Sequence, residues 1–100
     1  MSKRVDKAKR DRRSEAAAVD VLVGENIRRR RQGAEMTLDP AARMLGISAS
    51  QLSRYEKGLT STEPAMLVRM SVLFECNTCD FLEGVAPESD ERRAGKGGLK

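Results

Sequence analysis

The sequence predicts a single small all-α domain, and three observations lead to this prediction. Apolar residues recur at helical spacing, i, i+3, i+4 and i+7, in successive stretches of the chain. Helix start signals and glycine stop signals separate these stretches. The 100 residues are 39% hydrophobic, which suffices for one compact core, and with three aromatic residues and no Trp that core must be mainly aliphatic.

The first helix is expected from Ser14 to Gln32, because Gly33 can stop it and one of its faces is largely apolar. That face consists of Val19, Leu22, Val23, Asn26 and Ile27.

Charge is distributed unevenly along the chain. Residues 1–13 carry seven cations and two anions, residues 14–86 carry eight cations and ten anions, and residues 87–100 have a net charge of +1. A uniformly basic DNA-wrapping surface is therefore not supported. Residues 1–13 lack the apolar stretch of a signal peptide or membrane span. We interpret residues 1–13 and 87–100 as disordered flexible tails, the first being either a solubilising segment or an arm that touches phosphates.

A second helix is expected after Thr37, which can cap it, with Pro40 tolerated in its first turn. Gly46 then ends this helix in a left-handed conformation, and Ile47 follows into the core. The shared apolar face consists of Leu38, Ala41, Ala42 and Leu45.

A third helix begins at a Ser-x-x-Gln capping box formed by Ser48 and Gln51, and it stops at Gly58. At 100° per residue, Leu52, Tyr55 and Glu56 fall on the inner side. The outer side is small, polar and basic, with Ser50, Ser53, Arg54 and Lys57, and Ala49 lies at its edge. A helix of this kind fits the DNA major groove. From spacing alone, an ordinary helical hairpin with a solvated face is equally open.

Two further helices complete the prediction. Thr62 and Pro64 signal the start of a fourth helix, and Asn77 can cap a short fifth helix that holds Phe81 and Leu82. The fourth carries an apolar stripe that we interpret as core rather than as a partner groove: Met66, Leu67, Met70, Leu73 and Phe74.

The stretch 37–58 resembles the Cro and phage-repressor-like (XRE-type) helix-turn-helix family. Within this stretch the matching residues are Thr37, Ala42, Leu45, Gly46, Ile47, Ser48, Leu52, Ser53, Arg54, Tyr55, Glu56, Lys57 and Gly58. Outside it they are Ile27, Arg28, Arg31, Leu67, Met70, Phe74, Cys76, Phe81 and Leu82. The resemblance covers residues 21–83 and implies a five-helix lambda-repressor-like DNA-binding domain, which we assign to residues 14–86.

The resemblance also implies roles for individual residues. The expected base contacts are Ala49, Ser50 and Arg54, and the expected DNA-backbone contacts are Thr37, Arg43, Ser53, Lys57, Arg28 and Arg30. Arg31 and Glu56 are expected to form a structural salt bridge. Many relatives carry Gln where this chain has Leu38 and Ala49, and those Gln side chains contact phosphate and base respectively. We therefore expect few direct contacts to base edges.

The implied function is a sequence-specific transcriptional regulator, a repressor that inserts helix 48–57 into the major groove of double-stranded DNA. We expect the chain to form a homodimer through its last helix, with Phe81 and Leu82 contributing to the contact. We also expect a cytoplasmic, nucleoid-associated location, with the protein encoded by a bacterium or phage. Two alternatives remain open. In the first, the chain is an antitoxin of a toxin-antitoxin pair and binds a protein partner. In the second, it is a protein-interaction adaptor that has lost DNA readout.

The sequence offers no catalytic constellation, and we expect no enzyme activity, cofactor or metal. Cys76 and Cys79 form a lone Cys-x-x-Cys, but a structural zinc site needs four ligands and the chain has no His and no other Cys. Since the family usually has a buried Val where Cys76 stands, we interpret it as a small core residue beside an exposed thiol, and a redox pair is the alternative.

Overall fold

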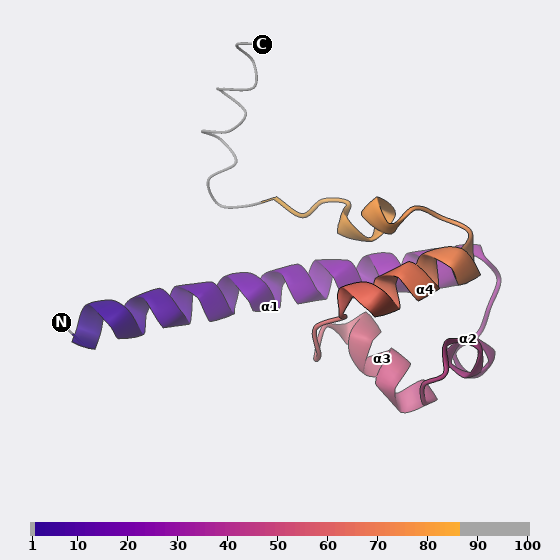
Figure 1. Ribbon diagram of the computed structural model, residues 1–100, viewed down its shortest axis with the longest axis horizontal. Coiled ribbons are helices and arrows are strands. Elements are labelled where there is room, and N and C mark those ends of the chain that lie inside the picture. Colours follow the sequence, from indigo (N-terminus) through magenta and orange to yellow (C-terminus); the bar gives the residue numbers. More distant parts are fainter. Residues whose placement is uncertain (1, 87–100) are drawn as a thin grey trace, which may run out of the picture.

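The computed structural model describes residues 2–86 and has four α-helices followed by one 3-10 helix (Figure 1). They are α1 (Ser2–Gly33), α2 (Leu38–Leu45), α3 (Ala49–Lys57), α4 (Pro64–Phe74) and η1 (Thr78–Leu82). There is no strand within residues 2–86, in line with the predicted all-α class. The predicted count of five α-helices is not confirmed, because the last element is a five-residue 3-10 helix.

Helix α1 begins at Ser2, whereas the sequence predicted a start at Ser14, so the helix is longer than predicted. Residues 2–13 were expected to be disordered, yet they continue the helix. They are mostly Lys and Arg, which are good helix formers, and they contain no Gly or Pro that would stop a helix. Residue 1 and the predicted tail 87–100 lie outside the described residues. The division of the chain into tails and a domain therefore stays a prediction.

The ends of α2 and α3 have the expected local signals. Gly46 and Gly58 end these helices with φ of 77° and 74°, a left-handed conformation that costs glycine little. The Ser48 hydroxyl accepts a hydrogen bond from the Gln51 amide at 3.0 Å, which caps α3. Thr37 occupies the cap position of α2 but makes no side-chain hydrogen bond there, so its expected capping bond is absent.

The core lies where α1, α2, α3, α4 and η1 meet. Its fully buried large side chains are Ile27, Leu52, Met70 and Phe81. A Cβ atom at Gly24 would come within 2.4 Å of the Tyr55 carbonyl oxygen, so glycine permits the close packing of α1 on α3. Asn26 donates hydrogen bonds to the carbonyls of Phe81 and Glu83, both at 2.9 Å, and so joins η1 to α1.

Candidate nucleic-acid interface

Helix α3 has one buried side and one exposed side. Leu52, Tyr55 and Glu56 are buried, as expected from the helical spacing. On the other side Ser50, Arg54 and Lys57 are exposed, and Ala49 and Ser53 are half-buried. Because Ser50 and Arg54 are four residues apart, their side chains lie on one face of the helix. The exposed side therefore presents the small side chain of Ala49 and the hydroxyl of Ser50 in the first turn, and the guanidinium of Arg54 one turn later.

A buried ion pair fixes α3 against α1. The Arg31 Nε donates to Glu56 Oε2 at 2.6 Å and the Arg31 Nη2 donates to Glu56 Oε1 at 3.0 Å, which makes the contact bidentate. Both residues are only 8% exposed. The remaining guanidinium nitrogen, Nη1, donates to the Met36 carbonyl at 2.8 Å. One side chain thus links α1, α3 and the loop before α2.

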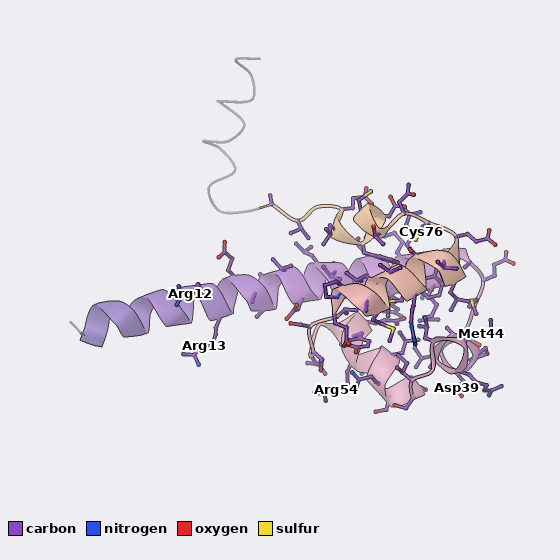
Figure 2. The ribbon with its side chains drawn as sticks, viewed as in Figure 1. Arg12, Arg13, Asp39, Met44, Arg54 and Cys76 are labelled. Atoms are coloured by element: carbon purple, nitrogen blue, oxygen red, sulfur yellow. The ribbon has the colours of Figure 1, made fainter. Side chains whose placement is uncertain are left out.

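Arg54 is anchored in an exposed position. Its Nε donates to the Thr60 hydroxyl at 3.2 Å, and the side chain lies on the outer surface of α3, away from α1 (Figure 2). Since Nε holds this single bond, the two terminal guanidinium nitrogens stay available for a ligand. Thr60 was not recognised from the sequence, because it lies in the irregular segment between α3 and α4, where no helical spacing relates it to Arg54.

A cleft of about 240 Å³ collects several of the expected DNA-backbone contacts. Arg28 from α1 lines it together with Ser53 and Lys57 from α3. Leu38, the first residue of α2, also lines it, and the exposed Thr37 precedes Leu38 directly. The remaining lining is the Arg31–Glu56 ion pair, whose two charges offset each other. Two exposed cations and a hydroxyl from two helices therefore surround one hollow, an arrangement suited to a phosphate group.

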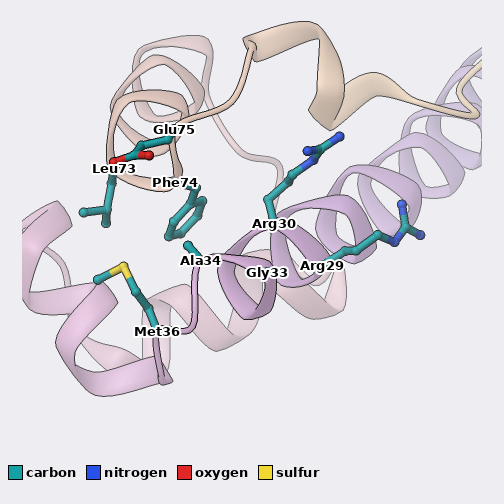
Figure 3. Close-up of a pocket in the computed structure, with 8 residues that line it drawn as sticks. All are labelled: Arg29, Arg30, Gly33, Ala34, Met36, Leu73, Phe74 and Glu75. Atoms are coloured by element: carbon teal, nitrogen blue, oxygen red, sulfur yellow. The ribbon is translucent and has the colours of Figure 1, made fainter.

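Arg30 and Arg43 lie outside this cleft. Arg30 and Arg28 are two residues apart, so their side chains leave α1 in nearly opposite directions. The Arg30 guanidinium lies 3.6 Å from the Asp80 carboxylate of η1, and it borders a different hollow near Phe74 and Glu75 (Figure 3). The structure thus does not bring Arg30 to the other expected DNA contacts. Arg43 is exposed in the last turn of α2.

Comparison with known proteins identifies the family from these same residues. Residues 27–81, more than half of the chain, match the helix-turn-helix family. The chain belongs to the helix-turn-helix family, in its Cro and phage-repressor type. The chain is 31% identical over 78 residues to an uncharacterized HTH-type transcriptional regulator, y4aM, of Sinorhizobium fredii (strain NBRC 101917 / NGR234). No solved structure matches the chain.

The match to that relative covers 78% of this chain and 54% of the relative, so the chain spans about half the length of the curated relative it matches. None of the chain's described helices is both long enough and apolar enough to cross a membrane.

The two cysteines flank the start of η1. Cys76 is half-buried and Cys79 is exposed. Burial raises the pKa of the Cys76 thiol, with the nearby Arg30 opposing this effect. Within residues 2–86 there is no group of three or more His, Cys, Asp or Glu side chains arranged to hold a metal ion.

Proposed function

We propose that the chain is a sequence-specific transcriptional repressor that inserts α3 into the major groove of double-stranded DNA. One observation carries this proposal. The exposed side of α3 is small, polar and basic, while its other side is locked to α1 by the buried Arg31–Glu56 pair. A rigidly held helix with such a surface is the geometry that groove recognition needs.

Arg54 is the main source of base specificity in this proposal. Its two terminal nitrogens can bond O6 and N7 of one guanine, a contact worth about 1–3 kcal/mol of discrimination. Ser50, on the same face one turn earlier, adds a hydroxyl that discriminates weakly. Ala49 offers only a methyl group, which suits a thymine methyl.

The phosphate contacts are assigned to the rim of the cleft. Arg28, Ser53 and Lys57 can hold one backbone phosphate, since they come from two helices and surround one hollow. Thr37 and Arg43, at the two ends of α2, are assigned to neighbouring phosphates. Arg30 is left out of the proposed contacts, because it faces Asp80.

We assign repression because a helix-turn-helix bound at an operator can exclude other proteins from that stretch of DNA. One helix-turn-helix covers a short half-site, and tight specific binding requires two copies about one DNA turn apart. Of the two residues predicted to pair the copies, Phe81 is fully buried in its own core, which leaves Leu82, at 48% exposure. We place the protein in the cytoplasm of a bacterium or of a phage host, associated with the nucleoid.

Selection of bound duplexes from a random-sequence pool at about 150 mM salt tests this function, with the wild type compared with Arg54→Ala. We expect a near-palindromic site with a G in each half, and a preference for that G that relaxes in the variant. Arg30→Ala is the matched control, since it removes the same charge on the other side of α1 and should leave the site unchanged. Sequence-independent binding that collapses as salt rises would contradict the proposal.

A further inference from the structure

Among the described residues, the exposed guanidinium of Arg54 is held at one nitrogen. Its Nε donates to the Thr60 hydroxyl at 3.2 Å, and no described carboxylate forms an ion pair with it. A guanidinium can bind a planar partner in two ways, through the outer pair Nη1 and Nη2 or through the side pair Nε and Nη2. Since Thr60 occupies Nε, the outer pair remains for two bonds to one base.

Thr60 is itself fixed on both sides. Before it, the Leu59 amide donates to the Arg54 carbonyl at 3.0 Å. After it, the Ser61 hydroxyl donates to the Asp20 carboxylate of α1 at 2.6 Å. The segment that carries Thr60 is therefore tied to α3 at one end and to α1 at the other. Its hydroxyl thus has a defined position relative to both helices.

The turn at Gly58 brings this segment onto α1. Gly58 has a φ of 74°, and a Cβ atom there would lie 2.6 Å from the Val21 Cα atom, so the two backbones are in direct contact. Val21 follows Asp20, and therefore neighbouring residues of α1 make this contact and accept the Ser61 hydrogen bond. Helix α1 supports the segment on both sides of Thr60.

We infer that Thr60 is a positioning residue for base recognition. It holds Arg54 so that the edge formed by Nη1 and Nη2 meets a guanine, and the bond between Ser61 and Asp20 keeps Thr60 in place. This inference rests on the proposed recognition of DNA by α3 and adds the residues that determine how strongly guanine is preferred.

Two physical effects connect the Thr60 bond to the base preference. A long side chain loses rotamer freedom when it binds, and Arg54 has lost part of that freedom before DNA arrives. A fixed edge also matches the O6 and N7 acceptors of one guanine, whereas a mobile guanidinium can turn to a phosphate instead. Because the hydroxyl is neutral, it orients the guanidinium without offsetting its positive charge, as a carboxylate would.

The test uses the full-length chain and the duplex site that selection with the wild type recovers. A second duplex carries A·T in place of the preferred G·C pair, and the ratio of the two Kd values at about 150 mM salt gives the G preference. Thr60→Val removes the hydroxyl and keeps the shape of the side chain, whereas Thr60→Ser keeps the hydroxyl. Thr62→Val is the matched control, since Thr62 is also half-buried in this segment but Arg54 bonds Thr60.

We expect Thr60→Val to lower the G preference about threefold to tenfold, the range for one lost hydrogen bond. The Kd for the A·T duplex should change less than about twofold, and Thr60→Ser and Thr62→Val should keep the wild-type preference. Ser61→Ala, which releases the segment from Asp20, should lower the preference by a smaller factor. In an Arg54→Ala background, Thr60→Val should change neither Kd, because no guanidinium is left to hold. Urea denaturation should give Thr60→Val the wild-type midpoint, which separates positioning from a loss of folding.

Three results would overturn the inference. A Thr60→Val chain with the wild-type G preference means that Arg54 does not need the hydroxyl. Equal losses on both duplexes that persist in the Arg54→Ala background mean that Thr60 contacts a phosphate directly. A loss that Thr60→Ser does not restore means that the shape of the side chain matters and the hydrogen bond does not. Failure of the proposed function looks different, since the wild type itself would then prefer no G, or would keep its preference in Arg54→Ala.

Discussion

The two halves of α1 share one backbone geometry but are held in different ways. In the C-terminal half (residues 19–33), Val23, Asn26, Ile27 and Arg31 are buried, and α3 and η1 pack against them. In the N-terminal half (residues 2–18), every side chain that the structure describes is exposed. Tertiary contacts therefore hold the C-terminal half in place. Within a single copy, the N-terminal half depends on helix propensity.

This difference coincides with the limits of the family. The helix-turn-helix match begins at Ile27, inside the buried half, and leaves the projecting half outside it. The shared part is thus the part that must be packed to present α3, while the N-terminal half is free to carry features of its own. We therefore expect substitutions in the C-terminal half to lower folding stability much more than substitutions in the N-terminal half.

The largest expected effect is at the buried ion pair. Glu56→Ala leaves the Arg31 guanidinium buried without its counter-charge, which should lower the free energy of unfolding by about 3–5 kcal/mol. Urea denaturation measures this. Glu15→Ala removes the same side chain from the exposed half and should change the value by less than about 0.5 kcal/mol. Similar losses in both variants would show that burial does not distinguish the two halves.

The next effect concerns the closest approach of α1 to α3. Gly24→Ala places a Cβ atom 2.4 Å from the Tyr55 carbonyl oxygen and 2.6 Å from that of Glu56. Because backbone atoms must shift to relieve this overlap, we expect a loss of about 3 kcal/mol in urea denaturation. Gly33→Ala is the matched control, since no atom lies within 4 Å of the added Cβ atom. It should be neutral or slightly stabilising, and a Gly24→Ala protein of wild-type stability would refute the close packing.

The helix-turn-helix could be predicted from sequence because its signals are local. The Ser48 cap and the glycines at 46 and 58 determine the ends of α2 and α3 within a few residues of chain. The inner face of α3 follows from helical spacing, since Leu52, Tyr55 and Glu56 all point one way. Such signals depend on nearest neighbours and on one dominant period, so the sequence contains them in full.

Other features depend on packing that no short stretch encodes. The composition of residues 2–13 suits both a disordered basic tail and an exposed helix, so the start of α1 was predicted at the wrong residue. Four consecutive arginines give no sign of which partner each will find, and Arg30 pairs with Asp80, 50 positions away. The full burial of Phe81 depends on the fold of the whole chain, so helical spacing alone could not show that its side chain lies in the core and not at the surface.

A moderate effect is expected where α1 holds the last element. Asn26→Ala removes the donor to the carbonyls of Phe81 and Glu83, which should cost about 2 kcal/mol because one of these contacts is buried. Hydrogen exchange should rise mainly in residues 78–85 and little in α3. Asn77→Ala, at an exposed cap of η1, is the control and should cost less. Equal exchange increases in α3 and η1 would mean that Asn26 supports the whole body instead.

The smallest expected effect tests the N-terminal half directly. Arg13→Pro removes a backbone donor from the middle of α1 and should disrupt the helix over the preceding turn. At low micromolar concentration, where association contributes little, the free energy of unfolding should change by less than about 0.5 kcal/mol, because every residue from Arg12 to Ala18 is exposed. Circular dichroism should nevertheless report lost helix, whereas Arg13→Ala, which removes the charge alone, should keep it. A loss above about 1 kcal/mol in the proline variant would mean that the N-terminal half packs against its own body. A loss that appears only at high protein concentration would instead place its contacts in a second copy, since binding of the native state adds stability by mass action.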